Sequence, residues 1–179
     1  MKTEIVENNP MRALRIGKVV VNMSVGESGT PLEHSQTIIE QITGQKPCQR
    51  MAKQTIRSWN IHRKEPIACM VTLRGPKAIE FLKKAFTAVG NRINPKSFDK
   101  RGNFAFGIRE HIDIPGTKYD PSLGIAGMDV IISIERPGYH IEKRKHAQSK
   151  VGKSHRVSPD ESIEYIEKTY GVEIGEKIE

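Results

Sequence analysis

Cysteine is scarce in this chain of 179 residues, and its two cysteines lie far apart. Cys48 and Cys69 form no CxxC pair, which excludes a disulfide scaffold and a four-cysteine zinc site. We expect both to be buried, reduced thiols. Long hydrophobic runs are also missing, since no stretch approaches the roughly 18 apolar residues of a membrane helix. The first ten residues carry acids and a proline where a signal peptide is apolar, so the sequence predicts a soluble, cytoplasmic protein.

Catalytic and cofactor motifs are absent as well. The glycine loop at residues 26–29 lacks the lysine of a phosphate-binding P-loop and matches neither GxGxxG nor GxSxG. The six histidines show neither HExxH spacing nor a neighbouring cysteine pair. Glu110 and Asp113, expected on a strand, would point to opposite faces, which argues against a paired acid–base site. The sequence therefore predicts no catalytic residue, no metal site and no cofactor.

Charge is abundant and weighted toward bases. Lys and Arg total 29 against 21 acids, and the formal net charge of +8 favours a polyanionic partner. The bases concentrate in residues 45–64 and 136–156, whereas the last twenty residues are acidic. One such run alone is explained equally well by a solvated face. Two of them, one with Trp59 and one with Tyr139, favour a nucleic acid as the partner.

Hydrophobic periodicity predicts an α+β fold. Alternating apolar residues predict strands at residues 16–25, 67–74, 104–112 and 128–135. Helices are expected to begin at Thr30, with a capping box completed by Glu33, after Gly75, and at Ser158 with a second capping box. This order indicates an antiparallel sheet with helices packed on one face. The chain divides into an α+β RNA-binding domain (1–135), a basic extension (136–157) and a C-terminal helix with an acidic tail (158–179).

The two faces of this sheet differ in chemistry. The residues expected in the core are Val19, Val21, Met23, Val25, Ile67, Cys69, Val71 and Leu73 of the strands, with Ile79, Leu82, Phe86 and Val89 of the second helix. The opposite face carries Lys18, Asn22, Ser24, Thr72 and Arg74, all able to form hydrogen bonds. Such a face fits an RNA-binding sheet or a sheet face in contact with water, and the pattern alone does not decide between them.

Five short segments carry a family resemblance. They are Lys18–Glu27 (KVVVNMSVGE), Ile42–Pro47 (ITGQKP), Val71–Gly75 (VTLRG), Pro95–Asp99 (PKSFD) and Arg101–Phe104 (RGNF). In order and spacing, over about residues 10–135, they resemble the large-subunit ribosomal proteins that carry 5S ribosomal RNA, universal protein five of that subunit. The tail from Arg136 to Ser158 and the segment Asn9–Arg12 resemble the archaeal and eukaryotic branch of this family.

This resemblance implies a function and a set of partners. Its members are non-enzymatic proteins that bind 5S ribosomal RNA and dock it, with neighbouring ribosomal proteins, on the central protuberance through the large ribosomal RNA. They also contact transfer RNA in the peptidyl site. The resemblance places the 5S contact at Asn22, Gln45 and Thr72 with Lys18 and Arg74, and the transfer-RNA contact at Arg57, Arg63 and Lys64. The bases expected on ribosomal RNA in the tail are Lys143, Arg144, Lys145, Lys150, Lys153 and Arg156.

Several alternatives stay open at this point. An RNA-processing or RNA-modifying enzyme and a general RNA chaperone would both use a basic sheet. Residues 136–156 hold few apolar anchors, so we expect them to be mobile alone and ordered against ribosomal RNA. Trp59 either closes the base of its loop as a core residue or provides a stacking platform for a base or ribose. Single tryptophans are usually well buried, which favours the core interpretation.

Overall fold

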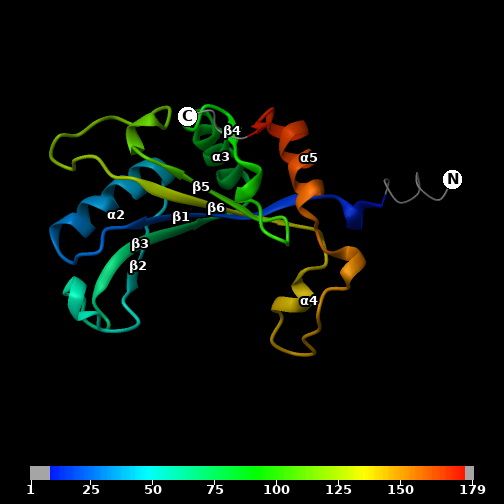
Figure 1. Ribbon diagram of the computed structural model, residues 1–179, viewed down its shortest axis with the longest axis horizontal. Coiled ribbons are helices and arrows are strands. Elements are labelled where there is room, and N and C mark those ends of the chain that lie inside the picture. The colour runs from blue at the N-terminus through cyan, green and yellow to red at the C-terminus, as the bar shows by residue number, and fades with distance from the viewer. Residues whose placement is uncertain (1–8, 176–179) are drawn as a thin grey trace.

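A five-stranded antiparallel sheet forms the centre of the structure, a computed structural model that describes residues 9–175 (Figure 1). Its strands are β1 (Arg15–Ser24), β2 (Cys48–Met51), β3 (Pro66–Leu73), β5 (Phe104–Ile108) and β6 (Met128–Glu135). They lie in the order β2-β3-β1-β6-β5, so the first strand is at the middle of the sheet. The predicted α+β fold with an antiparallel sheet is confirmed.

Helices lie on one side of this sheet, as Figure 1 shows. They are α2 (Thr30–Thr43), α3 (Pro76–Ala88) and, near the end of the chain, α5 (Pro159–Tyr170). A short parallel pair of β4 (Arg92–Ile93) and β7 (Glu173–Ile174) joins the end of α3 to the segment after α5. The short α4 (His140–Lys143) and single 3-10 turns at residues 10–12, 57–59, 95–97, 111–113 and 153–155 complete the described elements.

The core fills the space between the sheet and its helices. Its central members are Val19, Val21, Met23, Cys69, Val71, Leu73, Val130, Ile132 and Ile134 of the strands, with Leu32, Ile38, Ile39, Phe81, Leu82 and Phe86 of the helices. Each such side chain contributes roughly 1.5–3 kcal/mol when it leaves water. Val25 and Val89 pack partly buried against this core, and Ile67 is half-buried.

Three local predictions from the sequence are wrong, each for a structural reason. Ile79 is 43% exposed, because the buried stripe of α3 follows Ala78, Phe81, Leu82, Ala85 and Phe86 and leaves Ile79 at its edge. Helix α2 has no side-chain cap, since Thr30 already lies inside the helix and the N-cap is Gly29 at φ 95°. Cys48 is exposed because it lies on the edge strand β2, whose four residues all face solvent.

Other details of the sequence prediction hold. Cys69 is fully buried, and its burial raises the pKa of the thiol to about 11. The Ser158 capping box of α5 is confirmed, because Ser158 Oγ accepts from Glu161 N at 3.3 Å and Glu161 Oε2 accepts from Ser158 N at 3.1 Å.

The third predicted strand is shorter than expected. Strand β5 ends at Ile108, and residues 111–113 form a 3-10 turn. The strand placement expected for Glu110 and Asp113 is therefore wrong.

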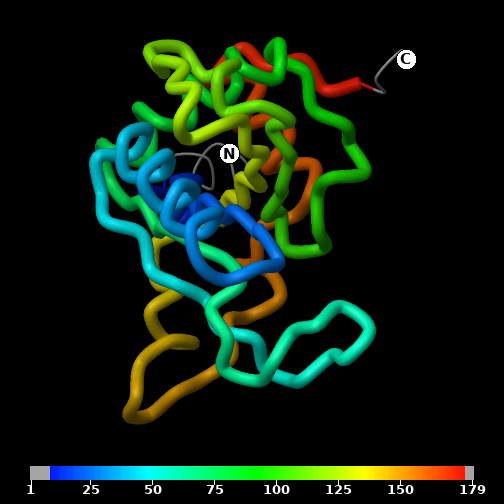
Figure 2. Tube along the Cα trace, turned by 90° about the vertical axis from the view of Figure 1, so that its left-hand side faces the viewer, coloured from blue at the N-terminus to red at the C-terminus, as the bar shows by residue number. Residues whose placement is uncertain are grey.

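Two segments project from the sheet on the side opposite α2 and α3 (Figures 1 and 2). The first is the hairpin that leads from β2 to β3, residues 52–65, which we call the tip hairpin. The second is the connection from β6 to α5, residues 137–157, which contains α4 and which we call the basic loop. Each contains most of one basic run, the tip hairpin that of residues 45–64 and the basic loop that of residues 136–156. The uncovered side of the sheet lies between them.

Candidate nucleic-acid interface

The side of the sheet away from α2 and α3 is an open face, across which the described part of the chain lays no helix (Figure 1). Strand pairing sets its rows, because residues directly opposite one another point to the same side. Asn22 lies between Met70 of β3 and Asp129 of β6, and Val20 lies between Thr72 and Ile131. On the three central strands, the open face includes Lys18, Val20, Asn22, Ser24, Met70, Thr72, Asp129, Ile131 and Ser133. The edge strands add residues that pair with these rows, among them Arg50 of β2 and Gly107 of β5.

This face is mixed in chemistry and less polar than the sequence predicted. Val20 and Met70 are half-buried on it, and Ile131 is 40% exposed. Lys18, Asn22 and Thr72 are half-buried, and Ser24 is exposed, where alternation placed them. The result is a band of apolar surface within polar groups. Such a band offers flat contact to bases and riboses, while the polar groups offer hydrogen bonds.

The residues expected at the 5S contact gather on the open face. Gln45 follows α2, and its Nε2 donates to the backbone oxygen of Thr72 at 3.4 Å. Asn22 lies on the adjoining strand and donates from Nδ2 to Ser24 Oγ at 3.0 Å. The register of β1 and β3, continued by one residue, sets Lys18 beside Arg74 at one end of the face. The two bases thus lie at the end of the face next to Thr72, and Asn22 lies toward its other end.

A hollow of about 480 Å³ lies at the other end of the open face, around Asn22. It is lined by Asn22, Ser24, Gly107, Ile108, Arg109, Gly127, Met128 and Asp129. Sequence reasoning missed Asp129 and Arg109 as candidate site residues. Alternation along residues 128–135 already contained part of the signal, since the buried residues Val130, Ile132 and Ile134 leave Asp129 on the opposite face.

The tip hairpin holds its three predicted bases, Arg57, Arg63 and Lys64, exposed to solvent. Backbone bonds close its base, because Ala52 N donates to Glu65 O at 2.8 Å and Lys64 N donates to Ala52 O at 2.9 Å. The hydrogen bond from the His62 backbone, and then that from Ser28, lower the pKa of the Glu65 carboxyl.

Trp59 is 71% exposed, so its expected place in the core is wrong. It ends a 3-10 turn at the extremity of the tip hairpin, with Ile56 and Ile61 bridged beneath it. The buried residue of this hairpin tip is Ile61, at 9% exposure, and not Trp59. The exposed indole therefore lies beside exposed bases, which is the surroundings expected of a stacking platform.

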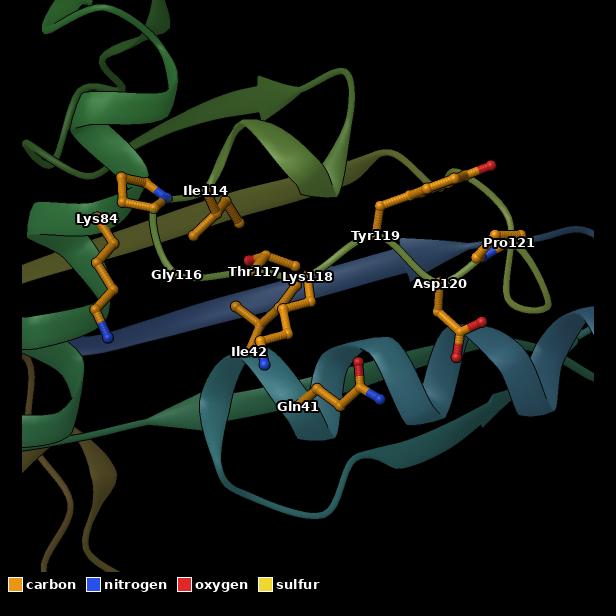
Figure 3. A pocket seen from close by; sticks show the side chains of 11 residues that line it. Gln41, Ile42, Lys84, Ile114, Gly116, Thr117, Lys118, Tyr119, Asp120 and Pro121 are labelled. Carbon is orange, nitrogen blue, oxygen red and sulfur yellow. The ribbon is translucent and has the colours of Figure 1, made fainter.

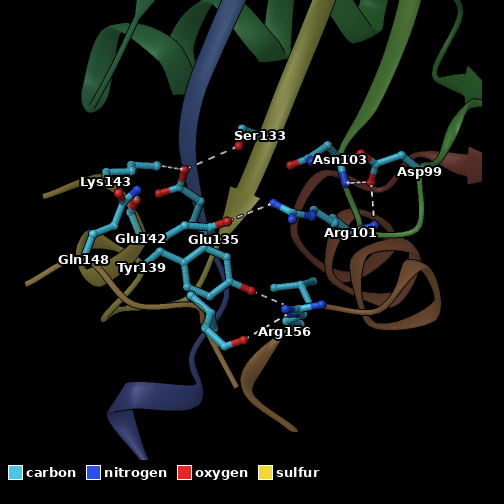
Figure 4. A network of polar contacts seen from close by, with 12 residues as sticks. Asp99, Arg101, Asn103, Ser133, Glu135, Tyr139, Glu142, Lys143, Gln148 and Arg156 are labelled. Carbon is cyan, nitrogen blue, oxygen red and sulfur yellow. Dashed lines mark hydrogen bonds and ion pairs between the residues drawn. The ribbon is translucent and has the colours of Figure 1, made fainter. Parts of the chain in front are cut away.

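The basic loop is closed at its neck by polar contacts (Figure 4). The Tyr139 hydroxyl accepts from Val157 N at 3.0 Å and donates to His155 O at 3.3 Å. His155 Nε2 lies 2.9 Å from Pro137 O. Below the neck, the buried Arg136 donates from Nη2 to Glu161 Oε1 at 2.7 Å. Polar contacts thus supply anchors in a segment where the sequence shows few apolar ones.

The six predicted bases of the basic loop fall into two groups. Lys143 pairs with Glu135, Arg144 Nε donates to Ala147 O at 2.8 Å, and Arg156 Nε donates to Val151 O at 3.2 Å. The remaining three, Lys145, Lys150 and Lys153, are exposed and form no ion pair within residues 9–175. Lys143, Arg144 and Arg156 thus form contacts within the protein, and Lys145, Lys150 and Lys153 are accessible to a polyanion.

A pocket of about 550 Å³ lies away from this face, between α2, α3 and residues 114–121 (Figure 3). Gln41 and Ile42 of α2, Lys84 of α3 and the loop residues Lys118 and Tyr119 line it. Within residues 9–175, no group of three or more His, Cys, Asp or Glu side chains is placed to hold a metal ion. No helix of that part of the chain is both long and apolar enough to cross a membrane.

Comparison with known families covers almost the whole chain. A family model described as "Ribosomal protein L5" matches residues 9–62, and a second model, which describes the C-terminus of the same ribosomal family, matches residues 66–165. The large ribosomal subunit protein uL5 of Methanococcus aeolicus is 51% identical over 174 residues, 96% of each chain.

Two further relatives carry the same name. The uL5 protein of Aeropyrum pernix is 50% identical over 167 residues, which cover 93% of this chain and 87% of the relative. That of Nitrosopumilus maritimus is 46% identical over 166 residues, covering 93% and 96%. The chain therefore belongs to the ribosomal L5 family, the uL5 proteins, which are structural, non-enzymatic components of the large ribosomal subunit.

Proposed function

We propose that this large-subunit protein binds 5S ribosomal RNA through the open face of its sheet. It then docks that RNA, with neighbouring proteins, on the central protuberance of the cytoplasmic ribosome. The observation that supports the proposal is that Asn22, Thr72, Lys18 and Arg74 lie on the uncovered face of the sheet, and that Gln45 contacts the backbone of Thr72. Family membership supports the same partner.

The chemistry of the face suits folded RNA. Lys18 and Arg74 neutralise phosphates and supply affinity that depends on salt but little on sequence. Neutral groups such as Asn22, Gln45 and Thr72 form hydrogen bonds to 2′-hydroxyls and to the edges of unpaired bases. In this arrangement the bases orient the RNA, and the neutral groups distinguish one RNA from another.

The two projections extend the contact to further RNA. The tip hairpin, with the exposed bases Arg57, Arg63 and Lys64 and the exposed Trp59, is proposed to reach transfer RNA in the peptidyl site. The basic loop is proposed to lie on the large ribosomal RNA through Lys145, Lys150 and Lys153, while its other bases hold its shape. Helix α5, which holds several acidic residues, lies on the helix side of the sheet (Figure 1).

A matched pair of glutamines tests the proposal. Gln45 donates to the backbone oxygen of Thr72 on β3, whereas Gln41, four residues earlier and also exposed, lines the pocket on the helix side. Gln45→Ala is expected to weaken binding of 5S RNA by about 1–3 kcal/mol, and Gln41→Ala by much less. Neither should change binding to an unrelated duplex of equal length. Equal losses in the two variants would show that 5S RNA does not lie on this face.

An enzyme or a general RNA chaperone makes different predictions for the wild-type protein. A chaperone without a fixed partner binds 5S RNA and an unrelated RNA of matched length with equal affinity. Family membership excludes the enzyme, and titration of both RNAs at one salt concentration decides the remaining question, since affinities for RNA are comparable only at equal salt.

A further inference from the structure

Two of the residues that line the hollow beside Asn22 are glycines, Gly107 and Gly127, so no side chain projects into it at these positions. A Cβ added to Gly127 would lie 3.0 Å from the Arg109 backbone oxygen, and one added to Gly107 would lie 3.7 Å from Asp129 Oδ1. Both glycines line the hollow, so its wall is backbone at these two places. At about 480 Å³, the space is much larger than the roughly 10–15 Å³ that one water needs. A flat group can therefore approach the backbone closely here.

The hollow also holds a carboxylate that phosphate binding does not explain. Asp129 is exposed, pairs in register with Asn22, and forms no ion pair within residues 9–175. Arg109 lines the same hollow without bonding to it. An ionised carboxylate repels phosphates, so on a surface that only collected phosphates it would weaken binding. Its presence beside Asn22 calls for a ligand with hydrogen-bond donors.

Guanine is the RNA base that fits a carboxylate acceptor. The carboxylate has two oxygens and no proton to donate, so it matches two adjacent donors. The Watson–Crick edge of guanine presents N1–H and the 2-amino group side by side. Adenine and cytosine each present one amino group next to a ring nitrogen that accepts, which would face a carboxylate oxygen unfavourably. An unpaired base exposes this edge, and a guanidinium can lie against its face.

We propose that this hollow receives one unpaired guanine of the bound RNA, and that the Asp129 carboxylate accepts from its N1–H and 2-amino group. Asn22 lies beside the base edge and Arg109 faces the ring or the adjoining phosphate. Asp129 is thus a specificity-determining residue that lowers affinity for RNA in general and raises it for an RNA with a guanine in this position. The proposal rests on the open face being the 5S RNA surface, as proposed above.

The first test compares two substitutions that each remove one negative charge. Asp129→Asn is expected to weaken binding of 5S RNA roughly 5- to 150-fold, the range by which a good bidentate contact discriminates between bases. Binding of an unrelated RNA of equal length should stay equal or become stronger. Glu40→Gln, on the exposed side of α2, is the control and should leave the ratio of the two affinities unchanged. If Asp129→Asn strengthens binding to both RNAs alike, the carboxylate is only repulsive and the proposal is overturned.

The second test identifies the base. Inosine lacks the 2-amino group of guanosine, so unpaired guanosines of 5S RNA are replaced by inosine one at a time. At one position the replacement should weaken binding to the wild type severalfold and have no further effect on Asp129→Asn. A scan in which every replacement affects both proteins equally overturns the proposal.

These outcomes are separate from failure of the proposed function. If wild-type protein showed no preference for 5S RNA, or if Gln45→Ala and Gln41→Ala were equivalent, the open face would not be the 5S surface. If that preference holds and Asp129→Asn keeps it unchanged, only the guanine contact is refuted.

Discussion

The neck of the basic loop gives a prediction whose size follows from the structure. Tyr139→Phe removes one hydroxyl and keeps the ring, which lies edge-on to His155 with centroids 6.0 Å apart. That hydroxyl accepts from Val157 N and donates to His155 O, across 18 and 16 residues of chain. Val157 is 1% exposed, so water cannot readily replace the lost acceptor.

The expected cost is that of a buried donor left without a partner. Such a backbone N–H costs about 1–3 kcal/mol, and the His155 carbonyl adds less because His155 is half-buried. If the neck opens as a local unit, exchange of the Val157 amide in the free protein should become roughly 5 to 150 times faster. The global unfolding midpoint should move by much less, because the core side chains are untouched.

Amide hydrogen exchange on the protein without RNA measures this directly. In the wild type, amides at the neck, including Val157, should exchange slowly, while those of residues 143–153 should exchange fast, since the exposed part of the loop is expected to be mobile alone. Tyr119→Phe makes the same chemical change at a tyrosine that is 54% exposed and should alter nothing at the neck.

Two results would contradict this reasoning. If Val157 exchanges as fast in the wild type as residues 143–153, the neck contacts do not hold the loop. If residues 143–153 are strongly protected without RNA, the loop is ordered by itself and the coupling of its folding to ribosomal RNA is wrong.

Three further predictions address other parts of the protein. Replacing Arg57, Arg63 and Lys64 of the tip hairpin with Ala should leave folding and 5S RNA binding nearly intact. It should loosen peptidyl-site transfer RNA on assembled ribosomes and lower the salt slope of that contact by about one per base; a folded variant that loses 5S RNA contradicts this. Burial opposes ionisation of Glu161, yet hydrogen bonds from the Ser158 backbone and Arg136 lower the pKa of its carboxyl below 4.5 overall. The ionised carboxylate therefore stabilises the fold above pH 4.5, and this contribution is lost as the pH falls through the lowered pKa. Glu161→Gln should therefore reduce the dependence of the free energy of unfolding on pH below about 4.5, as measured by urea unfolding. An unchanged pH dependence would refute the link between Glu161 ionisation and stability. Leu82→Ala should cost about 2–5 kcal/mol in urea unfolding, whereas Ile79→Ala at the exposed edge of α3 should cost under about 0.5 kcal/mol; similar losses would contradict the burial pattern.

Where alternation was strong, the sequence was sufficient to predict the fold. Strands β1, β3 and β6 fall within one or two residues of their predicted bounds, because each buries one face and leaves the other open. Strand β2 was not predicted, since all four of its residues are exposed and no alternation marks it. The exposure of Trp59 also escaped prediction, because composition carries no information on how far a hairpin projects.

The candidate site was predictable only in part. Asn22 and Thr72 follow from alternation within their own strands, and the resemblance added Gln45. Asp129 joins Asn22 only through the pairing of β1 with β6, which connects residues more than 100 positions apart. The neck of the basic loop likewise depends on contacts between distant residues, so polar anchoring there could not be read from local hydrophobicity.

A bulge in β1 determines which residues of this strand point to the open face of the sheet. Ile16 opposes Ile134, but Lys18 opposes Ser133, so Gly17 is an extra residue between two registers. Without it, Ile16 and Val19 could not both lie on the core side, because they are three residues apart and side chains alternate. A Cβ at Gly17 would lie 2.7 Å from the Glu135 side chain, the partner of Lys143 in the basic loop. The register that sets Asn22 opposite Asp129 thus begins after Gly17, and the missing side chain of this glycine leaves room for Glu135, which contacts the basic loop through Lys143.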